Sequence, residues 1–148
     1  MKVLRTWKKA HESDLESLVL EPKDLVLKPA VVILSGPMGA GKTTFVRTFS
    51  KVVDPLSNAT SPTYAVINEG TKVVHADFYR LETNEEVLHL ELPLYLEGKD
   101  YFLVEWGKRF LTRLSLEVPE EFNFYELTVE IVADEVRNFE LSDVTDEL

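Results

Sequence analysis

The stretch Gly36-Pro37-Met38-Gly39-Ala40-Gly41-Lys42-Thr43 decides the fold, because it matches the phosphate-loop pattern G-x-x-x-x-G-K-[ST] at every fixed position. Its glycines let the backbone turn closely enough for amide groups to face phosphate oxygens. Lys42 carries a positive charge to the outer phosphates, and Thr43 offers a hydroxyl to a magnesium ion where a helix begins. We therefore expect the residues that bind ATP to include Gly36, Met38, Gly39, Ala40, Gly41, Lys42, Thr43 and Thr44.

The residues on either side of the loop have the character that a phosphate loop requires. Residues 31–34 are apolar and mostly β-branched, which predicts a buried strand over 31–35. Residues 44–53 carry apolar side chains at helical spacing and end at Asp54-Pro55, which predicts a helix. This order favours a nucleotide site over an empty glycine-rich turn, because a lysine at the positive end of a helix is unfavourable without an anion.

Composition limits the class of protein. The chain has 148 residues, of which 45% are hydrophobic and 28% charged, so we expect a single soluble domain over 1–148. It contains no apolar run long enough for a transmembrane helix or a secretory signal, which favours the cytoplasm and no membrane partner. The absence of cysteine excludes disulfides, thiolate metal sites and cysteine nucleophiles.

Net charge bears on the partners. With 16 basic and 26 acidic residues, the formal charge is −10. Tight binding to RNA or DNA depends on neutralising phosphates, so any role near nucleic acid should pass through a partner protein. Part of the acidity lies in the tail at about 142–148, which we expect to be solvated and frayed.

The rest of the chain alternates apolar runs with polar turns and predicts an α/β domain. We expect a mixed, mostly parallel central sheet that includes an antiparallel hairpin and is flanked by helices. The predicted elements are a strand at 2–6, a helix at 12–20, a hairpin of 64–67 and 71–76 around Asn68-Glu69-Gly70, a helical stretch at 84–96 broken by Pro93, a buried strand at 101–104, a helix at 108–115, and a terminal hairpin of 125–132 and 136–141.

Two carboxylates end apolar strands where a phosphate site would need them. Asp77 follows the second strand of the hairpin, and Glu105 follows the strand at 101–104. Because ligands bind at the carboxyl ends of such strands, we assign Asp77 to the magnesium ion. Glu105 either polarises the attacking water or completes the metal shell. The alternatives are a helix cap for Asp77 and a paired surface acid for Glu105.

Other candidates depend on position alone. Thr63 lies between the first helix and the hairpin, where a switch threonine reaches magnesium and the terminal phosphate, and Pro62 would stiffen that loop. Arg80 either touches phosphate or pairs with a carboxylate. Trp106 either stacks on a base or a partner, or packs in the interior.

The remaining histidines and basic residues point to structural roles. His75 alternates with strand residues and is interpreted as structural, and none of the histidines has zinc-ligand spacing. Lys108, Arg109 and Arg113 form a small basic cluster, which we interpret as a solvated helix face, although an arginine there could act in trans.

Taken together, these motifs resemble one family over about residues 30–132. The shared blocks are the phosphate loop, Ser61-Pro62-Thr63-Tyr64, His75-Ala76-Asp77-Phe78-Tyr79-Arg80-Leu81 and Val104-Glu105-Trp106-Gly107. In order and spacing they are similar to TsaE (also called YjeE), the small bacterial ATPase of tRNA threonylcarbamoyladenosine biosynthesis. In this chain Pro37-Met38 replaces the usual Asp-Leu at variable positions of the loop, and Glu91 stands where a glycine is common.

The resemblance implies a compact P-loop domain that binds ATP with Mg²⁺ and hydrolyses it slowly alone and faster with partners. Those partners are TsaD and TsaB, the transferase subunits that modify adenosine 37 of tRNA, and hydrolysis is expected to reset their complex. The implied roles are phosphate binding by Lys42, metal binding by Thr43 and Asp77, catalysis by Glu105 as the second acid, a switch at Thr63, and a place beside the nucleotide for Trp106.

Three other functions stay open from the residues alone. A small-molecule or nucleoside kinase would need an acceptor pocket and a lid, for which this chain has little sequence to spare. A nucleotide-dependent binding module would bind ATP but turn it over negligibly. A GTPase is disfavoured, because the Asn-Lys-x-Asp guanine signature is absent and Arg80 occupies the glycine position of a D-x-x-G switch.

Overall fold

The computed structural model describes residues 1–57 and 65–148. Within them, seven strands form one sheet in the order β1-β7-β6-β2-β5-β4-β3. The strands are β1 (Lys2–His11), β2 (Ala30–Ser35), β3 (Ile67–Glu69), β4 (Val73–Asp77), β5 (Tyr101–Glu105), β6 (Asn123–Ala133) and β7 (Val136–Asp143). The α-helices are α1 (Leu15–Leu18), α2 (Leu20–Leu25), α3 (Lys42–Val53), α4 (Asn84–His89), α5 (Leu92–Leu96) and α6 (Leu111–Glu117).

Strand β2 lies at the centre of the sheet and leads directly into the phosphate loop. It runs parallel to β5 on one side and to β6 on the other, and β4 runs parallel to β5. Toward the edges the pairing is antiparallel, in β3 with β4 and in β7 with both β6 and β1. The predicted mixed α/β sheet is confirmed, with parallel pairing in its centre and antiparallel pairing toward both edges.

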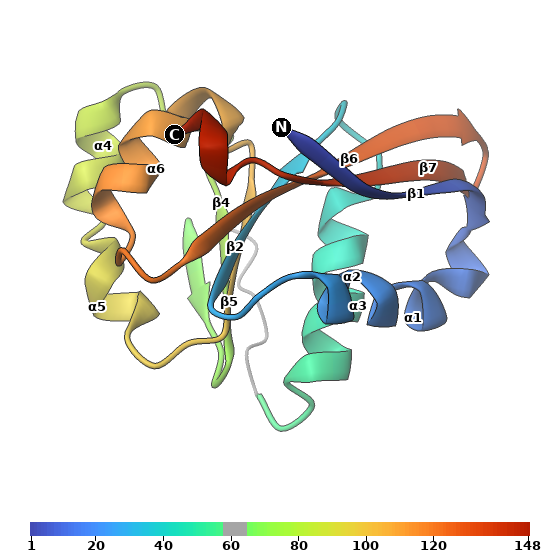
Figure 1. Ribbon diagram of the computed structural model, residues 1–148, viewed down its shortest axis with the longest axis horizontal. Coiled ribbons are helices and arrows are strands. Elements are labelled where there is room, and N and C mark those ends of the chain that lie inside the picture. Colours follow the sequence, from blue (N-terminus) through green and yellow to red (C-terminus); the bar gives the residue numbers. More distant parts are fainter. Residues whose placement is uncertain (58–64) are drawn as a thin grey trace.

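Helices cover both faces of the sheet, as Figure 1 shows, with α1, α2 and α3 on one face and α4, α5 and α6 on the other. Strand β2 is buried from Ala30 to Leu34 because both of its faces are covered. Under α3, Phe45 stacks on Phe49 at 6.0 Å between centroids, and Phe49 meets Tyr101 edge-on at 5.0 Å. These aromatic contacts fix α3, and with it the phosphate loop, against the sheet.

The alternation of side chains in β4 and β5 places the polar groups of the two strands on the α3 face. In β5, Tyr101 and Leu103 pack into the core under α3, whereas Phe102 and Val104 pack into the opposite core. Because alternate residues share a face, Glu105 follows Tyr101 and Leu103 toward α3. Thus the two strands bring their carboxyl ends to the start of that helix.

The N-terminal region is longer in both of its elements than the sequence predicted. The strand continues to His11 and pairs along β7. Helical structure continues from a 3₁₀ turn at Glu12–Asp14 through α1 and α2 to Leu25, with a single turn residue at Val19. The predicted end at residue 20 was wrong because Pro22 lies in the first turn of α2, where a missing N–H costs nothing.

The internal hairpin turns two residues later than predicted. Residues 67–69 pair with β4, so the chain reverses at 70–72 instead of at 68–70. The carboxylate of Asp54, at the end of α3, accepts hydrogen bonds from the amides of Lys72 at 2.8 Å and Val73 at 3.3 Å, which holds the turn there. The expected start of the hairpin at Tyr64 lies outside the described residues.

Two further predictions are corrected. The stretch at 84–96 breaks at Glu91, which takes a left-handed φ of 56°, and Pro93 lies in the first turn of α5 instead of breaking a helix. The tail at about 142–148 is not frayed along its length, because Ser142 and Val144 are buried and Thr145–Glu147 forms a 3₁₀ turn. The amide of Phe124 donates to Oγ1 of Thr145 at 3.2 Å, which ties the tail to β6.

Candidate active site at the phosphate loop

The phosphate loop (residues 36–43) connects β2 to α3, and two of its positions require glycine. A Cβ on Gly36 would lie 2.5 Å from the carbonyl oxygen of Val129 on β6, so the loop passes too close to that strand for any side chain. Gly41 precedes the first residue of α3 with a φ of 99°, a conformation that other residues rarely adopt. The glycines of the motif therefore serve the close fit of the loop as well as its turn.

Lys42 holds its ammonium group inside the loop. The side chain is buried, and its Nζ donates to the carbonyl oxygen of Gly36 at 2.6 Å and lies 3.5 Å from the centroid of the Trp106 ring. Burial lowers the pKa of Lys42 from its ordinary value, although the charges of Glu105 and Asp77 oppose that shift. An anion at this point would compensate a charge that is costly to bury.

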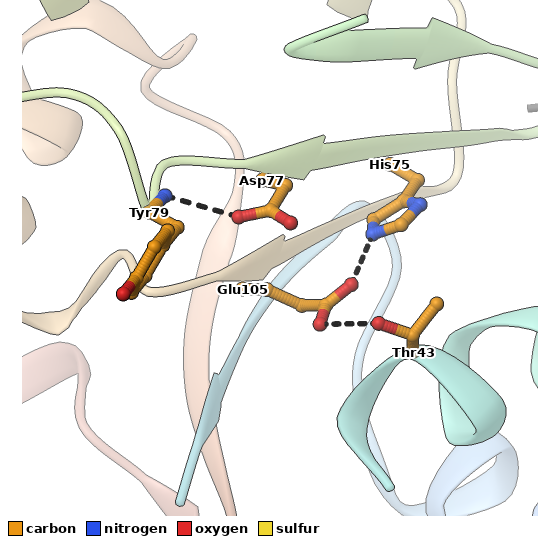
Figure 2. Close-up of polar contacts among 5 residues, drawn as sticks. All are labelled: Thr43, His75, Asp77, Tyr79 and Glu105. Atoms are coloured by element: carbon orange, nitrogen blue, oxygen red, sulfur yellow. Dashed lines mark hydrogen bonds and ion pairs between the residues drawn. The ribbon is translucent and has the colours of Figure 1, made fainter. Parts of the chain in front are cut away.

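Glu105 joins the loop helix to two strands, as Figure 2 shows. Its Oε1 accepts the hydroxyl proton of Thr43 at 2.7 Å, and its Oε2 lies 2.6 Å from Nε2 of His75 on β4. Burial alone would raise the pKa of Glu105. Hydrogen bonds from His75 and Thr43, together with the charges of His75 and Lys42, outweigh burial and lower that pKa. Glu105 is thus a buried carboxylate held in its ionised form.

Asp77 lies opposite Glu105 in the register of β4 and β5 but is exposed. Its Oδ1 accepts the amide proton of Tyr79 at 3.0 Å, within the turn that follows the strand (Figure 2). The Tyr79 ring lies 5.2 Å from that of Trp106, which has an unusual left-handed φ of 60°. These two rings form one wall beside the carboxylates and Lys42.

These residues surround an open cleft of about 380 Å³. Its lining comprises Met38, Gly39, Ala40, Gly41, Lys42, Thr43, Thr44, Asp77, Tyr79, Glu105 and Trp106. A smaller hollow of about 140 Å³ lies on the other side of the loop. It shares Gly39, Ala40, Gly41 and Thr44 with the cleft, and is closed by residues of β1 and β7. The loop therefore separates a polar cleft from a hollow against the edge of the sheet.

Comparison with known proteins identifies the family of this chain. A family model described as "Threonylcarbamoyl adenosine biosynthesis protein TsaE" matches residues 9–139. The chain belongs to the TsaE family. Proteins named "tRNA threonylcarbamoyladenosine biosynthesis protein TsaE" are among its relatives. That of Haemophilus influenzae is 30% identical over 119 residues, which cover 77% of this chain and 70% of the relative.

Other relatives agree with the TsaE assignment. The protein of the same name from Bacillus subtilis is 32% identical over 121 residues, which cover 79% of this chain and 75% of the relative. The one from Nostoc is 40% identical over 88 residues, and this match spans 54% of each protein, about half of either length. The crystal structure of Bacillus subtilis YdiB superposes with a TM-score of 0.63 over 99% of this chain and 90% of that one, at 22% identity, which shows a common fold.

The structure brings most of the predicted site residues of this TsaE-family chain together. Of the predicted nucleotide contacts, Gly36 is the one that does not line the cleft, although its carbonyl binds Lys42. The hydroxyl of Thr43 donates a hydrogen bond to Glu105, whereas the carboxylate of Asp77 accepts one from the Tyr79 amide. Thr63, the predicted switch residue, lies outside the described residues. Within the described residues, no helix is long and apolar enough to cross a membrane.

His75, which the sequence indicates to be structural, lies behind the site without lining the cleft. Its ring contacts the carboxylate of Glu105, so it holds a residue of the cleft in place. The sequence contains a signal for this position, because His75 lies two residues before Asp77 on the same strand and must therefore share its face. Tyr79 lies in the shared block that begins at His75, but the sequence analysis gives it no role, and the structure places it in the wall of the cleft.

The basic cluster is exposed at Lys108 and Arg109, as the sequence predicts for a solvated helix face, but each of its side chains also has partners within the fold. Lys108 pairs with the buried Glu126 at 3.0 Å, and Arg113 pairs with Glu117 at 3.1 Å. The guanidinium of Arg109 donates to the backbone carbonyls of Phe78, Tyr79 and Leu81. Arg109 therefore fixes the turn after Asp77, which holds Tyr79 against the cleft.

Proposed function

We propose that the protein binds and hydrolyses Mg-ATP as the nucleotide-dependent subunit of the machinery that makes threonylcarbamoyladenosine at position 37 of tRNA. Membership of the TsaE family supports the pathway, since the family is described as biosynthesis proteins of threonylcarbamoyl adenosine. The partners that the sequence resemblance implies are the transferase subunits TsaD and TsaB. The net charge of −10 supports an indirect contact with tRNA, held by those partners.

One observation carries the nucleotide assignment: the Thr43–Glu105 hydrogen bond of 2.7 Å at the first turn of α3, next to the buried Lys42. A hydroxyl that donates to a carboxylate keeps its oxygen lone pairs available to a cation. The start of α3 and the Lys42 ammonium together favour a polyanion in the same place. Such an arrangement supports binding of a triphosphate and its counter-ion side by side.

The oxygen donors fit magnesium only in part. The Thr43 hydroxyl and the carboxylates of Glu105 and Asp77 are hard oxygen ligands of the kind that Mg²⁺ prefers. Among residues 1–57 and 65–148, no group of three or more histidine, cysteine, aspartate or glutamate side chains could hold a metal ion alone. Nucleotide phosphates and water would therefore have to complete the shell, as is usual for Mg²⁺ at phosphate sites. When bound, the ion would neutralise charge on the phosphates.

The chain's own residues divide the remaining work. Lys42 would exchange its bond to the Gly36 carbonyl for the outer phosphate oxygens. Glu105, whose oxygens are engaged by Thr43 and His75, is placed to orient the Thr43 hydroxyl. Asp77 is exposed in the cleft with one oxygen bound to the Tyr79 amide, so we assign it to orienting the attacking water. The sequence assigned Asp77 to the metal ion and left Glu105 between the attacking water and the metal shell, so this proposal adds a role for Asp77 and ties Glu105 to Thr43.

The decisive experiment measures ATP hydrolysis by the purified protein alone, with TsaD and TsaB, and with both subunits and tRNA. We expect slow release of phosphate alone and a clear increase with the subunits. Lys42→Ala should abolish both rates, whereas Lys51→Ala, which removes an exposed lysine from the same helix, should change neither. No Mg-ATP binding by the native chain, or no effect of the subunits on turnover, would refute the proposal. Phosphate appearing on an added acceptor would instead identify a kinase.

A further inference from the structure

Arg137, on the C-terminal hairpin, binds the phosphate loop on the side of the smaller hollow, away from the cleft. Its Nε donates to the carbonyl oxygen of Ala40 at 2.7 Å, and one terminal nitrogen lies 3.4 Å from the carbonyl oxygen of Gly39. The other terminal nitrogen donates to the carbonyls of Ala133 at 2.9 Å and Val136 at 3.0 Å, the two strand residues that flank the turn between β6 and β7. The guanidinium thus joins the loop to a hairpin almost a hundred residues away in sequence.

The bond to Ala40 fixes the direction of a loop amide. A trans peptide is planar, so the N–H of Gly41 points opposite to the carbonyl of Ala40. Gly41 lines both the cleft and the smaller hollow, whereas Arg137 lines the hollow and not the cleft. With the Ala40 carbonyl bound on the hollow side, the Gly41 amide is directed toward the cleft. A phosphate bound there would find this donor already oriented.

Arg137 also changes the charge around the loop. Carbonyl oxygens near a phosphate repel it, and the guanidinium neutralises the partial charges of two of them. Within the described residues, no carboxylate forms an ion pair with Arg137. Its positive charge adds to that of Lys42 on the opposite side of the same loop, although Glu12 and Glu135 also line the hollow.

We propose that Arg137 is a positioning residue for phosphate binding, which holds the loop amides toward the triphosphate through the carbonyls of Gly39 and Ala40. This inference rests on the proposed function, because it concerns how the same site binds ATP. Two other roles would use the same side chain: a brace for the hairpin turn alone, or a direct contact with the nucleoside. The three roles differ in which ligands lose affinity when Arg137 is replaced.

The test compares two ligands, Mg-ATP and magnesium tripolyphosphate, by titration calorimetry. Tripolyphosphate offers the phosphate chain without the nucleoside, so it reports on the loop alone. The proteins are the native chain, Arg137→Ala, Arg137→Lys and, as a matched control, Arg47→Ala, which removes an exposed arginine from α3. Arg137→Lys keeps the charge but not the forked geometry of the guanidinium. Thermal unfolding of each ligand-free protein reports on the hairpin.

Positioning predicts that Arg137→Ala weakens both ligands by about tenfold and by similar factors, because charge-assisted bonds that orient the loop are lost. Arg137→Lys should fall between this variant and the native chain, and Arg47→Ala should bind as the native chain does. Guanidinium ion added at a concentration too low to unfold the protein should restore part of the affinity of Arg137→Ala. Ammonium ion should not, because it cannot form the forked contact.

Three results would overturn the inference. Loss of ATP affinity with unchanged tripolyphosphate affinity would assign Arg137 to the nucleoside. A lower unfolding temperature with unchanged affinity for both ligands would assign it to the hairpin alone. Weaker binding that guanidinium does not restore, in a folded protein, would also contradict it. Should Arg137→Ala fail to fold, the same comparison with Arg137→Lys decides. A native chain that binds neither ligand would refute the proposed function instead.

Discussion

Removing the imidazole of His75 should destabilise the ligand-free protein through Glu105. The side chain of Glu105 is 4% exposed and that of His75 is 15% exposed, so water replaces the lost bond poorly. The Nε2–Oε2 distance is 2.6 Å, and a hydrogen bond to a buried charge contributes about 1.5–3 kcal/mol. We expect His75→Ala to lower the free energy of unfolding by about 2 kcal/mol, which corresponds to a decrease of about 6 °C in the midpoint of thermal unfolding.

The same substitution should change the pH dependence of stability. The folded-state pKa of Glu105 is lowered, so its ionised form stabilises the protein above the unfolded-state value and this contribution is lost as the pH falls through the folded-state pKa. His75 is one cause of that lowering, so the pKa of Glu105 rises in His75→Ala. The stability difference should therefore be largest near neutral pH and narrow below about 4.5, the ordinary value for glutamate.

Urea unfolding of metal-free and nucleotide-free protein measures these differences. His89→Ala is the matched control, since it removes an exposed histidine from the end of α4. A double-mutant cycle of His75→Ala and Glu105→Gln should give a coupling energy of about 1–2 kcal/mol, as expected for a direct contact. A coupling below about 0.3 kcal/mol, or equal losses in His75→Ala and His89→Ala, would refute the assigned role.

Three other results test the site. Glu105→Ala should retain ATP but lose hydrolysis, because the Thr43 hydroxyl is no longer oriented; normal single-turnover hydrolysis would remove Glu105 from the mechanism. The pKa of Lys42 is lowered in the ligand-free protein, so Mg-ATP affinity should fall as the pH rises through that pKa, because Lys42 must then take up a proton when the nucleotide binds. Calorimetry in buffers of different ionisation enthalpy measures this uptake, and constant affinity up to pH 10.5 would contradict it. Gly36→Ala should destabilise the fold and weaken ATP binding, because its Cβ would meet the Val129 carbonyl at 2.5 Å; native-like melting and affinity would show that the loop can move away.

The parts of the fold that local patterns determine were predictable from sequence. The strand before the phosphate loop and the helix after it were both confirmed, since each is marked by apolar periodicity and by the motif between them. Glu105 is predicted to be a functional acid because it ends a continuously apolar strand, and its position beside the phosphate loop agrees with that prediction. The structure adds that this carboxylate is engaged by Thr43 and His75, and that its pKa is lowered despite burial.

Features that depend on distant contacts were not predictable. Arg137 binds the carbonyl of Ala40, which is 97 residues away in the sequence, so no local pattern could assign it to the phosphate loop. The turn of the internal hairpin is set by Asp54, which lies 18 residues before Lys72. Glu91 takes a left-handed conformation that its residue type disfavours, between α4 and α5, and its local sequence does not predict it. In the cases of Arg137 and Asp54, a contact from a distant part of the chain determines the conformation of a short segment.

Sheet register, more than attraction among the polar groups, sets the geometry of the site. Leu34 on β2 pairs with Glu105 on β5, which in turn pairs with Asp77 on β4, so both acids lie just before the level at which Gly36 opens the loop. Because side chains alternate, a slip of β5 by one residue would turn Val104 toward α3 and push the Glu105 carboxylate into the opposite apolar core. Burying that charge away from its partners would cost several kcal/mol. The packing of the apolar residues of β5 therefore determines on which face of the sheet the Glu105 carboxylate lies. The hydrogen bonds to Thr43 and His75 then fix the orientation of that carboxylate.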